Sequence, residues 1–159
     1  MLHIAGIDYE SIADAEGVRC TIFFSGCKHH CPGCHSPDTW DFDYGKPVDD
    51  LLIAEINRQI DRRPFLSGIV LSGGDPMYSA KEIREFLSKI HIPNNNIWCF
   101  SGFTIEEITQ DNEKKKLLDM CDTLIDGMFD IDKRDVTLRF RGSSNQRMFH
   151  QINGQWIEA

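Results

Sequence analysis

The sequence predicts an α/β fold in which amphipathic helices cover a mainly parallel sheet of about five to six strands. Short β-rich runs alternate with helical stretches, and Gly, Asn or Asp residues bound most of these runs. A strand–helix–strand repeat requires right-handed crossovers, which make neighbouring strands parallel. The chain of 159 residues fits the usual size of one domain, so we expect a single domain over residues 1–159.

The first half of the chain contains two expected strands and two expected helices. Residues 19–25 and 68–72 are rich in β-branched and aromatic or aliphatic side chains, as strands are. Between them, residues 48–62 place four apolar side chains at helical spacing. Residues 80–90 repeat this pattern along one stripe, so both segments are expected to be amphipathic helices that cover the sheet.

The second half continues the alternation with shorter elements. Strands are expected over residues 96–101, 123–126 and 136–141. Thr104 can cap a short helix with Glu107 in the capping-box position, and residues 114–120 carry the apolar side chains of another helix. Because ligands gather at the carboxyl ends of parallel strands, functional side chains are expected after these strands.

The charge balance argues against polyanionic partners. The chain has 17 Lys and Arg against 25 Asp and Glu, a net charge of -8. Binding to nucleic acid or to an anionic membrane surface is therefore not expected. No apolar stretch approaches the roughly 18 residues that span a bilayer, and the N-terminus lacks a signal-peptide pattern. We therefore expect a cytoplasmic protein.

Three cysteines with the spacing Cys-x3-Cys-x2-Cys follow the first expected strand: Cys27, Cys31 and Cys34. Three clustered thiols cannot all pair with one another, and in a reducing compartment such a cluster is more typical of a metal site. Zinc would need a fourth ligand, for which His29, His30 and His35 are candidates. A [4Fe-4S] cluster held by three cysteines would instead leave one iron without a protein ligand.

A glycine-rich turn follows the second expected strand, with the sequence Ser72-Gly73-Gly74-Asp75-Pro76. Glycines at this position permit a positive φ and a close approach of a ligand to the backbone. An ordinary turn would have the same residues, but the cysteine loop one strand–helix unit earlier favours a ligand site.

These two motifs together resemble the signature of the radical S-adenosylmethionine family. Within that family, the chain resembles the small activating enzymes of glycyl-radical enzymes over nearly its whole length. The shared segments are Gly17-Val18-Arg19, Ser25-Gly26-Cys27, Cys31-Pro32-Gly33-Cys34, Thr39-Trp40, the glycine turn, Ile97-Trp98, Ser101-Gly102-Phe103, Asp126-Gly127 and residues 141–147. The chain departs from the broader pattern at Gly33, where many members have an aromatic residue, and at His35, where the subgroup commonly has Tyr or Phe.

The resemblance implies a partial, open (β/α) barrel and a set of site residues. Cys27, Cys31 and Cys34 would hold a [4Fe-4S] cluster whose open iron is chelated by S-adenosylmethionine. The residues implied to bind this cofactor are Gly73, Gly74, Asp75, Ser101 and Asp126. Asp75 could also hold the turn. Ser101 could instead be an ordinary strand-end cap, and Asp126 an ordinary turn residue. A partner polypeptide would contact Arg141, Asn145 and Arg147, which are expected after the last strand.

The implied activity is the reductive cleavage of S-adenosylmethionine to install a glycyl radical on anaerobic ribonucleotide reductase. A flavodoxin- or ferredoxin-type protein would supply the electron. One alternative is a radical enzyme that acts on a small metabolite. Another, from a different class, is a Cys3His zinc-binding module, which would explain the cysteines but leave the glycine turn without a purpose.

Overall fold

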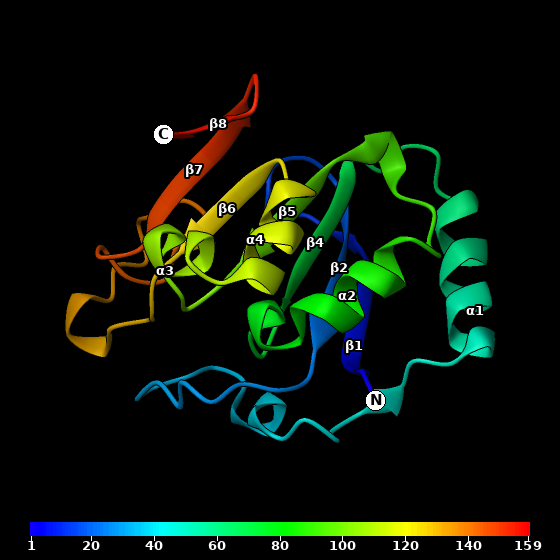
Figure 1. Ribbon diagram of the computed structural model, residues 1–159, viewed down its shortest axis with the longest axis horizontal. Coiled ribbons are helices and arrows are strands. Elements are labelled where there is room, and N and C mark those ends of the chain that lie inside the picture. Colours follow the sequence, from blue (N-terminus) through cyan, green and yellow to red (C-terminus); the bar gives the residue numbers. More distant parts are fainter.

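The protein, described here over residues 1–159 by a computed structural model, is built on one twisted eight-stranded sheet (Figure 1). Across the sheet the strands lie in the order β3-β1-β2-β4-β5-β6-β7-β8. Their bounds are β1 His3–Ser11, β2 Arg19–Phe24, β3 Lys46–Pro47, β4 Gly68–Gly73, β5 Ile97–Phe100, β6 Thr123–Asp126, β7 Arg147–Ile152 and β8 Gln155–Glu158.

The sheet is mixed, and the expected mainly parallel sheet of five to six strands in a partial barrel is wrong. Only the central pairs β2–β4, β4–β5 and β5–β6 are parallel. The pairs β3–β1, β1–β2, β6–β7 and β7–β8 are all antiparallel. The alternation of strands and helices correctly indicated the parallel centre, whereas the antiparallel flanks carry no helical crossovers and so lay outside that pattern.

The missed strands lie at the flanks, where one side of a strand is partly exposed. β1 changes register twice along β2, between Ile4 and Gly6 and between Asp8 and Ser11, which interrupts the alternation of apolar and polar residues. β7 and β8 form a hairpin whose turn residues, Asn153 and Gly154, have φ values of 52° and 79°. Asn-Gly is a strong hairpin signal that the strand assignment overlooked.

The strand expected over residues 136–141 is also wrong. These residues belong to the long connection between β6 and β7, which contains turns and the short 3-10 helix η4, Ile131–Lys133. Phe140 has a φ of 63°, a left-handed conformation that interrupts an extended strand. Its ring packs edge-on against Trp98, with the ring centroids 5.2 Å apart. Phe140, one of the residues that suggested a strand, therefore belongs to a loop and packs against the sheet.

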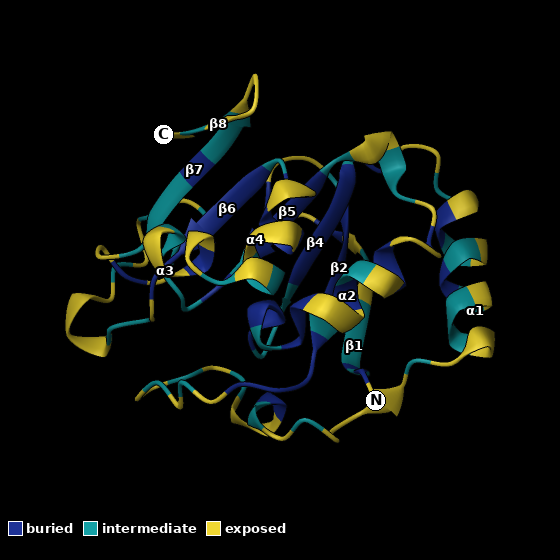
Figure 2. Ribbon diagram, viewed as in Figure 1, coloured by how far each residue is buried: buried dark blue, intermediate teal, exposed yellow.

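Four α-helices contribute to one face of the sheet (Figures 1 and 2): α1 Asp50–Asp61, α2 Ala80–Leu87, α3 Ile105–Thr109 and α4 Asn112–Asp119. Three further 3-10 helices connect them, η1 Pro37–Trp40, η2 Pro76–Ser79 and η3 Pro93–Asn95. The predicted capping box of α3 is confirmed, since the Thr104 hydroxyl accepts from the Glu107 N–H while the Glu107 carboxylate accepts from the Thr104 N–H.

The apolar core lies between these helices and the sheet. Alternate residues of β2 point into it, among them Ile22 and Phe24, together with Ile83 of α2 and Leu117 of α4. The three cysteines outside the 27–34 loop are fully or almost fully buried in this core, as expected of thiols that act as small apolar side chains: Cys20, Cys99 and Cys121. On the opposite face, loops cover a smaller apolar cluster that includes Trp98.

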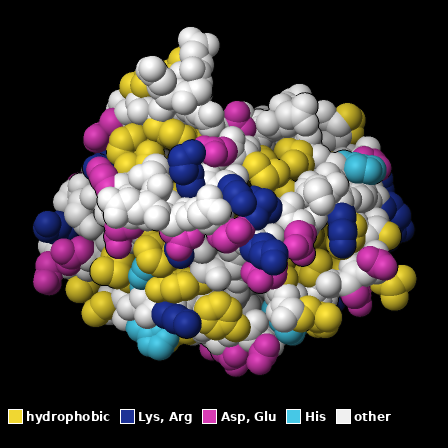
Figure 3. All heavy atoms as spheres, in the orientation of Figure 1, with side chains coloured by type: hydrophobic (Ala, Val, Ile, Leu, Met, Phe, Trp, Pro, Cys, Tyr) yellow, Lys and Arg dark blue, Asp and Glu magenta, His cyan; other side chains and the backbone are white.

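The parallel centre determines where a site can form. The carboxyl ends of β2, β4, β5 and β6 meet at one edge of the sheet, and the segments that follow β2 and β6 lie at this edge (Figure 1). Acidic and basic side chains are interspersed over the helices, and several apolar and histidine side chains lie along the lower edge of the same view (Figure 3). None of the helices has the length and apolar character needed to cross a membrane.

Candidate functional site

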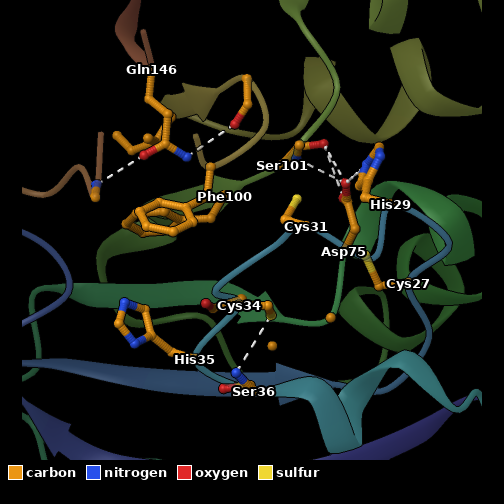
Figure 4. A pocket seen from close by; sticks show the side chains of 18 of the residues that line it. Cys27, His29, Cys31, Cys34, His35, Ser36, Asp75, Phe100, Ser101 and Gln146 are labelled. Carbon is orange, nitrogen blue, oxygen red and sulfur yellow. Dashed lines mark hydrogen bonds and ion pairs between the residues drawn. The ribbon is translucent and has the colours of Figure 1, made fainter. Parts of the chain in front are cut away.

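A cavity of about 270 Å³ opens at the carboxyl ends of the parallel strands (Figure 4). The cysteine loop after β2 and the glycine turn after β4 both line it, with the ends of β5 and β6 and part of the segment before β7. The predicted site residues among its lining are Cys27, Cys31, Cys34, Gly73, Gly74, Asp75 and Ser101. Two motifs separated by about 40 residues in the sequence therefore meet at one site, as the strand order of the sheet requires.

The cysteine loop begins with a sharp turn at Gly26. Its φ is 112°, and a Cβ there would lie 2.3 Å from the ring of Phe42, so only glycine fits. The Gly26 N–H donates to the Thr39 carbonyl at 2.7 Å, and the Cys27 N–H donates to the Trp40 carbonyl at 3.3 Å. These two hydrogen bonds attach the start of the loop to the 3-10 helix η1 and bring Cys27 to the cavity.

The three thiols have a donor chemistry that fits an iron–sulfur cluster. Cys27 is buried, and Cys31 and Cys34 are half-buried around the same cavity. Burial raises the pKa of Cys27 to about 11 and also raises the pKa of Cys31, so without a metal both are protonated at neutral pH. No group of three His, Cys, Asp or Glu side chains is placed to hold one metal ion. A [4Fe-4S] cluster has no need of such convergence, because each thiolate binds a different iron.

The histidines that were candidates for a fourth zinc ligand contact other groups. His29 Nε2 lies 2.7 Å from a carboxylate oxygen of Asp75. His30 stacks on Trp40 with the ring centroids 4.3 Å apart, and the His35 ring is 5.8 Å from that of Phe129. The loop thus presents three thiols to the cavity, while each imidazole has a separate contact.

The glycine turn lies against the end of β2. Gly73 has a φ of 103°, as expected for this turn, and a Cβ there would lie 2.4 Å from the Phe24 nitrogen. A Cβ at Gly74 would lie 2.7 Å from the carbonyl oxygen of Gly26 and 2.8 Å from that of Thr39. The two glycines therefore have a structural role that the sequence did not reveal, since they let the ends of β2 and β4 approach each other.

Asp75 connects this turn to β5 through its carboxylate, which is almost completely buried. It accepts hydrogen bonds from the N–H of Met77 at 3.0 Å, the N–H of Gly102 at 2.8 Å and the hydroxyl of Ser101 at 2.9 Å. The fourth partner is His29. Of the two interpretations of Asp75, the geometry favours the one in which it holds the turn, because both oxygens are engaged by protein groups.

Ser101 and Asp126 occupy different positions relative to the cavity. Ser101 lines the cavity, donates to Asp75 and accepts from the Phe103 N–H at 3.0 Å, the contacts of a strand-end cap. Asp126 is fully buried and accepts from the Ile105 N–H at 2.8 Å and from Arg147 at 2.6 Å. Its neighbours Ile125 and Gly127 line the cavity, whereas Asp126 does not.

The residues implied to bind a partner all make contacts within the chain. Arg147 opens β7, rather than following the last strand, and bonds to both Asp126 and Glu106. These bonds raise the pKa of Arg147 and lower that of Glu106 to about 2. Asn145 donates to the Met128 carbonyl at 2.8 Å, and Arg141 donates to the Gln146 carbonyl at 3.3 Å.

Phe100 and Gln146 are among the lining residues that were not predicted as site residues. Phe100 ends β5 and lies beside the cavity (Figure 4). Alternation along β5 could have placed it, since Trp98, two residues earlier, faces away from the helices. The Gln146 amide accepts from the Gly142 N–H at 2.8 Å and donates to the Gly127 carbonyl at 3.0 Å. It thereby closes the segment between β6 and β7 over the cavity, a long-range contact that local sequence patterns do not reveal.

Comparison with known proteins accounts for this site. Residues 13–149 match the family described as "4Fe-4S single cluster domain". The chain is 36% identical over 143 residues to the anaerobic ribonucleoside-triphosphate reductase-activating protein of Pasteurella multocida, covering 87% of this chain and 90% of the relative. It is 37% identical over 147 residues to the protein of the same name from Salmonella typhimurium, covering 87% and 92%. The chain belongs to this family of activating proteins.

Membership in the activating-protein family decides between the two metals that the cysteine spacing left open. The matched family is defined by a 4Fe-4S cluster, so the iron–sulfur interpretation of the cysteine loop is favoured over a Cys3His zinc module. The family also extends to a more distant relative, the activating protein of Enterobacteria phage T4, which is 31% identical over 144 residues. The resemblance inferred from the motifs is therefore confirmed over most of the chain.

Proposed function

We propose that this chain is the activating enzyme of an anaerobic ribonucleotide reductase. It would use a [4Fe-4S] cluster to cleave S-adenosylmethionine reductively and install a glycyl radical on the reductase. The observation that carries this proposal is the meeting of three thiols and the Gly73–Gly74 turn at one cavity, in a chain whose relatives are named as activators of that enzyme.

Cys27, Cys31 and Cys34 would bind three irons of the cluster and leave the fourth iron without a protein ligand. When bound, the cluster and S-adenosylmethionine supply one-electron cleavage of the sulfur–C5′ bond and a 5′-deoxyadenosyl radical that takes a hydrogen atom from glycine. A flavodoxin- or ferredoxin-type protein would supply the electron. The chain itself contributes positioning and the exclusion of water from the site.

The groups that would orient S-adenosylmethionine come from the strand ends. Gly73 and Gly74 line the cavity with backbone atoms alone, because they carry no side chain. Ser101 and Asp75 also line the cavity, and Asp75 holds the turn. Asp126 lies outside the lining and anchors α3 and Arg147. Phe100 and Trp40 supply apolar walls that limit the access of water.

The proposal predicts a protein radical. Reconstituted chain, S-adenosylmethionine and reductant should produce a glycine-centred signal in electron paramagnetic resonance when anaerobic ribonucleotide reductase is added. Methionine and 5′-deoxyadenosine should form in the same mixture. Brisk cleavage with no protein radical, or a small metabolite that consumes the deoxyadenosyl radical, would contradict the activase assignment and favour the small-molecule alternative.

A further inference from the structure

Three side chains separate Cys27 from Cys31, and only one of them is turned into the protein. Lys28 and His30 are exposed, whereas the His29 side chain is 11% exposed. Its ring belongs to a cluster of three aromatic rings, 5.1 Å from that of Tyr78 and 4.6 Å from that of Phe103, which are themselves 5.0 Å apart. Figure 4 shows it pointing from the cysteine loop toward Asp75 and Ser101.

The His29 side chain makes a hydrogen bond that joins residues 28–33 to the rest of the protein. Nε2 donates to Asp75 Oδ2 at 2.7 Å, and the carboxylate is 1% exposed. A hydrogen bond to a buried carboxylate is stronger than one between neutral groups. Of its two neighbours, Lys28 lies over the ring of Phe42 and His30 stacks on Trp40, contacts that are less directional than this hydrogen bond.

The same carboxylate joins three elements of the site. Asp75 accepts from the start of η2 at Met77 and from the end of β5 at Ser101 and Gly102. His29 also packs directly on this backbone, because a Cβ at Gly102 would lie 2.6 Å from His29 Cδ2. The middle of the cysteine loop is thereby fixed to the ends of β4 and β5.

We propose that His29 is a positioning residue that fixes the cysteine loop, and with it the cluster, relative to the Gly73–Gly74 turn. This inference rests on the proposed function, because it concerns where the cluster and S-adenosylmethionine meet. Because of the hydrogen bond to Asp75, the part of the loop between two cluster ligands keeps a fixed position relative to the ends of β4 and β5. Loss of that bond should loosen the binding of S-adenosylmethionine while leaving three thiols available for iron.

Two substitutions separate the hydrogen bond from the ring. His29→Phe keeps an aromatic ring against Tyr78 and Phe103 but removes the N–H donor. His29→Gln loses the ring but can still donate to Asp75. His30→Asn is the matched control, because His30 is an exposed neighbour with a φ of 50° that asparagine tolerates.

The measurement is made on the reconstituted, reduced protein. S-adenosylmethionine is titrated while the electron paramagnetic resonance spectrum of the cluster is recorded, with iron and sulfide quantified in parallel. We expect His29→Phe to retain iron and to bind S-adenosylmethionine about tenfold more weakly, as loss of one hydrogen bond to a charged group implies. His29→Gln should restore most of the affinity, and His30→Asn should match the wild type.

Equal affinity in His29→Phe and wild type would overturn the inference, as would a loss in His29→Gln as large as that in His29→Phe. If His29→Phe loses iron while His29→Gln keeps both iron and affinity, the N–H donor is again shown to position the loop. A wild-type cluster whose spectrum does not respond to S-adenosylmethionine would instead refute the proposed function, and the inference with it.

Discussion

The three cysteines of the 27–34 loop line the same cavity, and Cys27 is the most buried of them. The thiols lie on a loop that is turned by Gly26 and attached to η1 by two backbone hydrogen bonds. Replacing one thiol leaves these attachments in place. Loss of one thiol is therefore expected to impair metal binding without disturbing the fold of the loop.

Cys27→Ala, Cys31→Ala and Cys34→Ala should each lose most of the roughly four irons that an anaerobically reconstituted chain binds, because each thiolate holds a separate iron. Cys20→Ala should retain the iron, since that thiol is fully buried in the apolar core. Iron and sulfide analysis with the visible absorption spectrum tests both expectations. Tightly bound zinc, with no reconstitution by iron, would contradict the assignment of the loop to an iron–sulfur cluster.

At the scale of elements, the ends of β2 and β4 depend on each other. Gly74 donates its N–H to the Phe24 carbonyl at 2.7 Å, and the Asp75 N–H donates to the Gly26 carbonyl at 3.0 Å. These bonds link the glycine turn directly to the start of the cysteine loop. A change in either motif is therefore expected to disturb the other.

Gly74→Ala tests this dependence. Its Cβ would lie 2.7 to 2.8 Å from two backbone carbonyl oxygens, so the two strand ends must move apart. We expect a cost of about 2 kcal/mol and a melting temperature lower by roughly 4–8 °C, together with reduced iron content. Gly6→Ala is the control, because a Cβ there meets nothing within 4 Å. Full iron content in Gly74→Ala would show that the turn serves only the ligand.

At the scale of the whole molecule, the segment between β6 and β7 determines what can reach the cavity. Arg141 in this segment donates only one hydrogen bond, to Gln146, and its Nε is buried without a partner. Arg147 is different, because Asp126 and Glu106 already engage its guanidinium. Among the three residues proposed to bind a partner, Arg141 therefore has the most donor capacity left for a polypeptide carbonyl or carboxylate.

Arg141→Gln should uncouple the two half-reactions. We expect the yield of glycyl radical on the reductase to fall about tenfold, because a contact to the polypeptide is lost, while cleavage of S-adenosylmethionine without the reductase is retained. Arg134→Gln, in the same segment and exposed, should change neither quantity. Parallel losses of radical yield and cleavage in Arg141→Gln would place Arg141 in the cofactor site instead.

The sequence predicted the site best where a periodic strand pattern is followed directly by residues of unusual chemistry. The cysteine spacing, the glycine turn and the parallel centre were all recognisable, because a buried strand followed by unusual residues is a local pattern. The antiparallel flanks and the contacts of Arg147 with Asp126 and Glu106 depend on which distant segments meet. The same holds for Asp75, whose carboxylate could be assigned to holding the turn only when its four partners were located.

The order of the strands also bears on how the protein matures during synthesis. β2 and β4 are neighbours in the sheet, but the connection between Phe24 and Gly68 contains the whole cysteine loop. Pairing between segments so distant in the chain is slow, because a long loop must close first. All three thiols are therefore synthesised before the strand that shapes their surroundings. Until β4 joins the sheet, the nascent chain holds these thiols without the turn that completes the site.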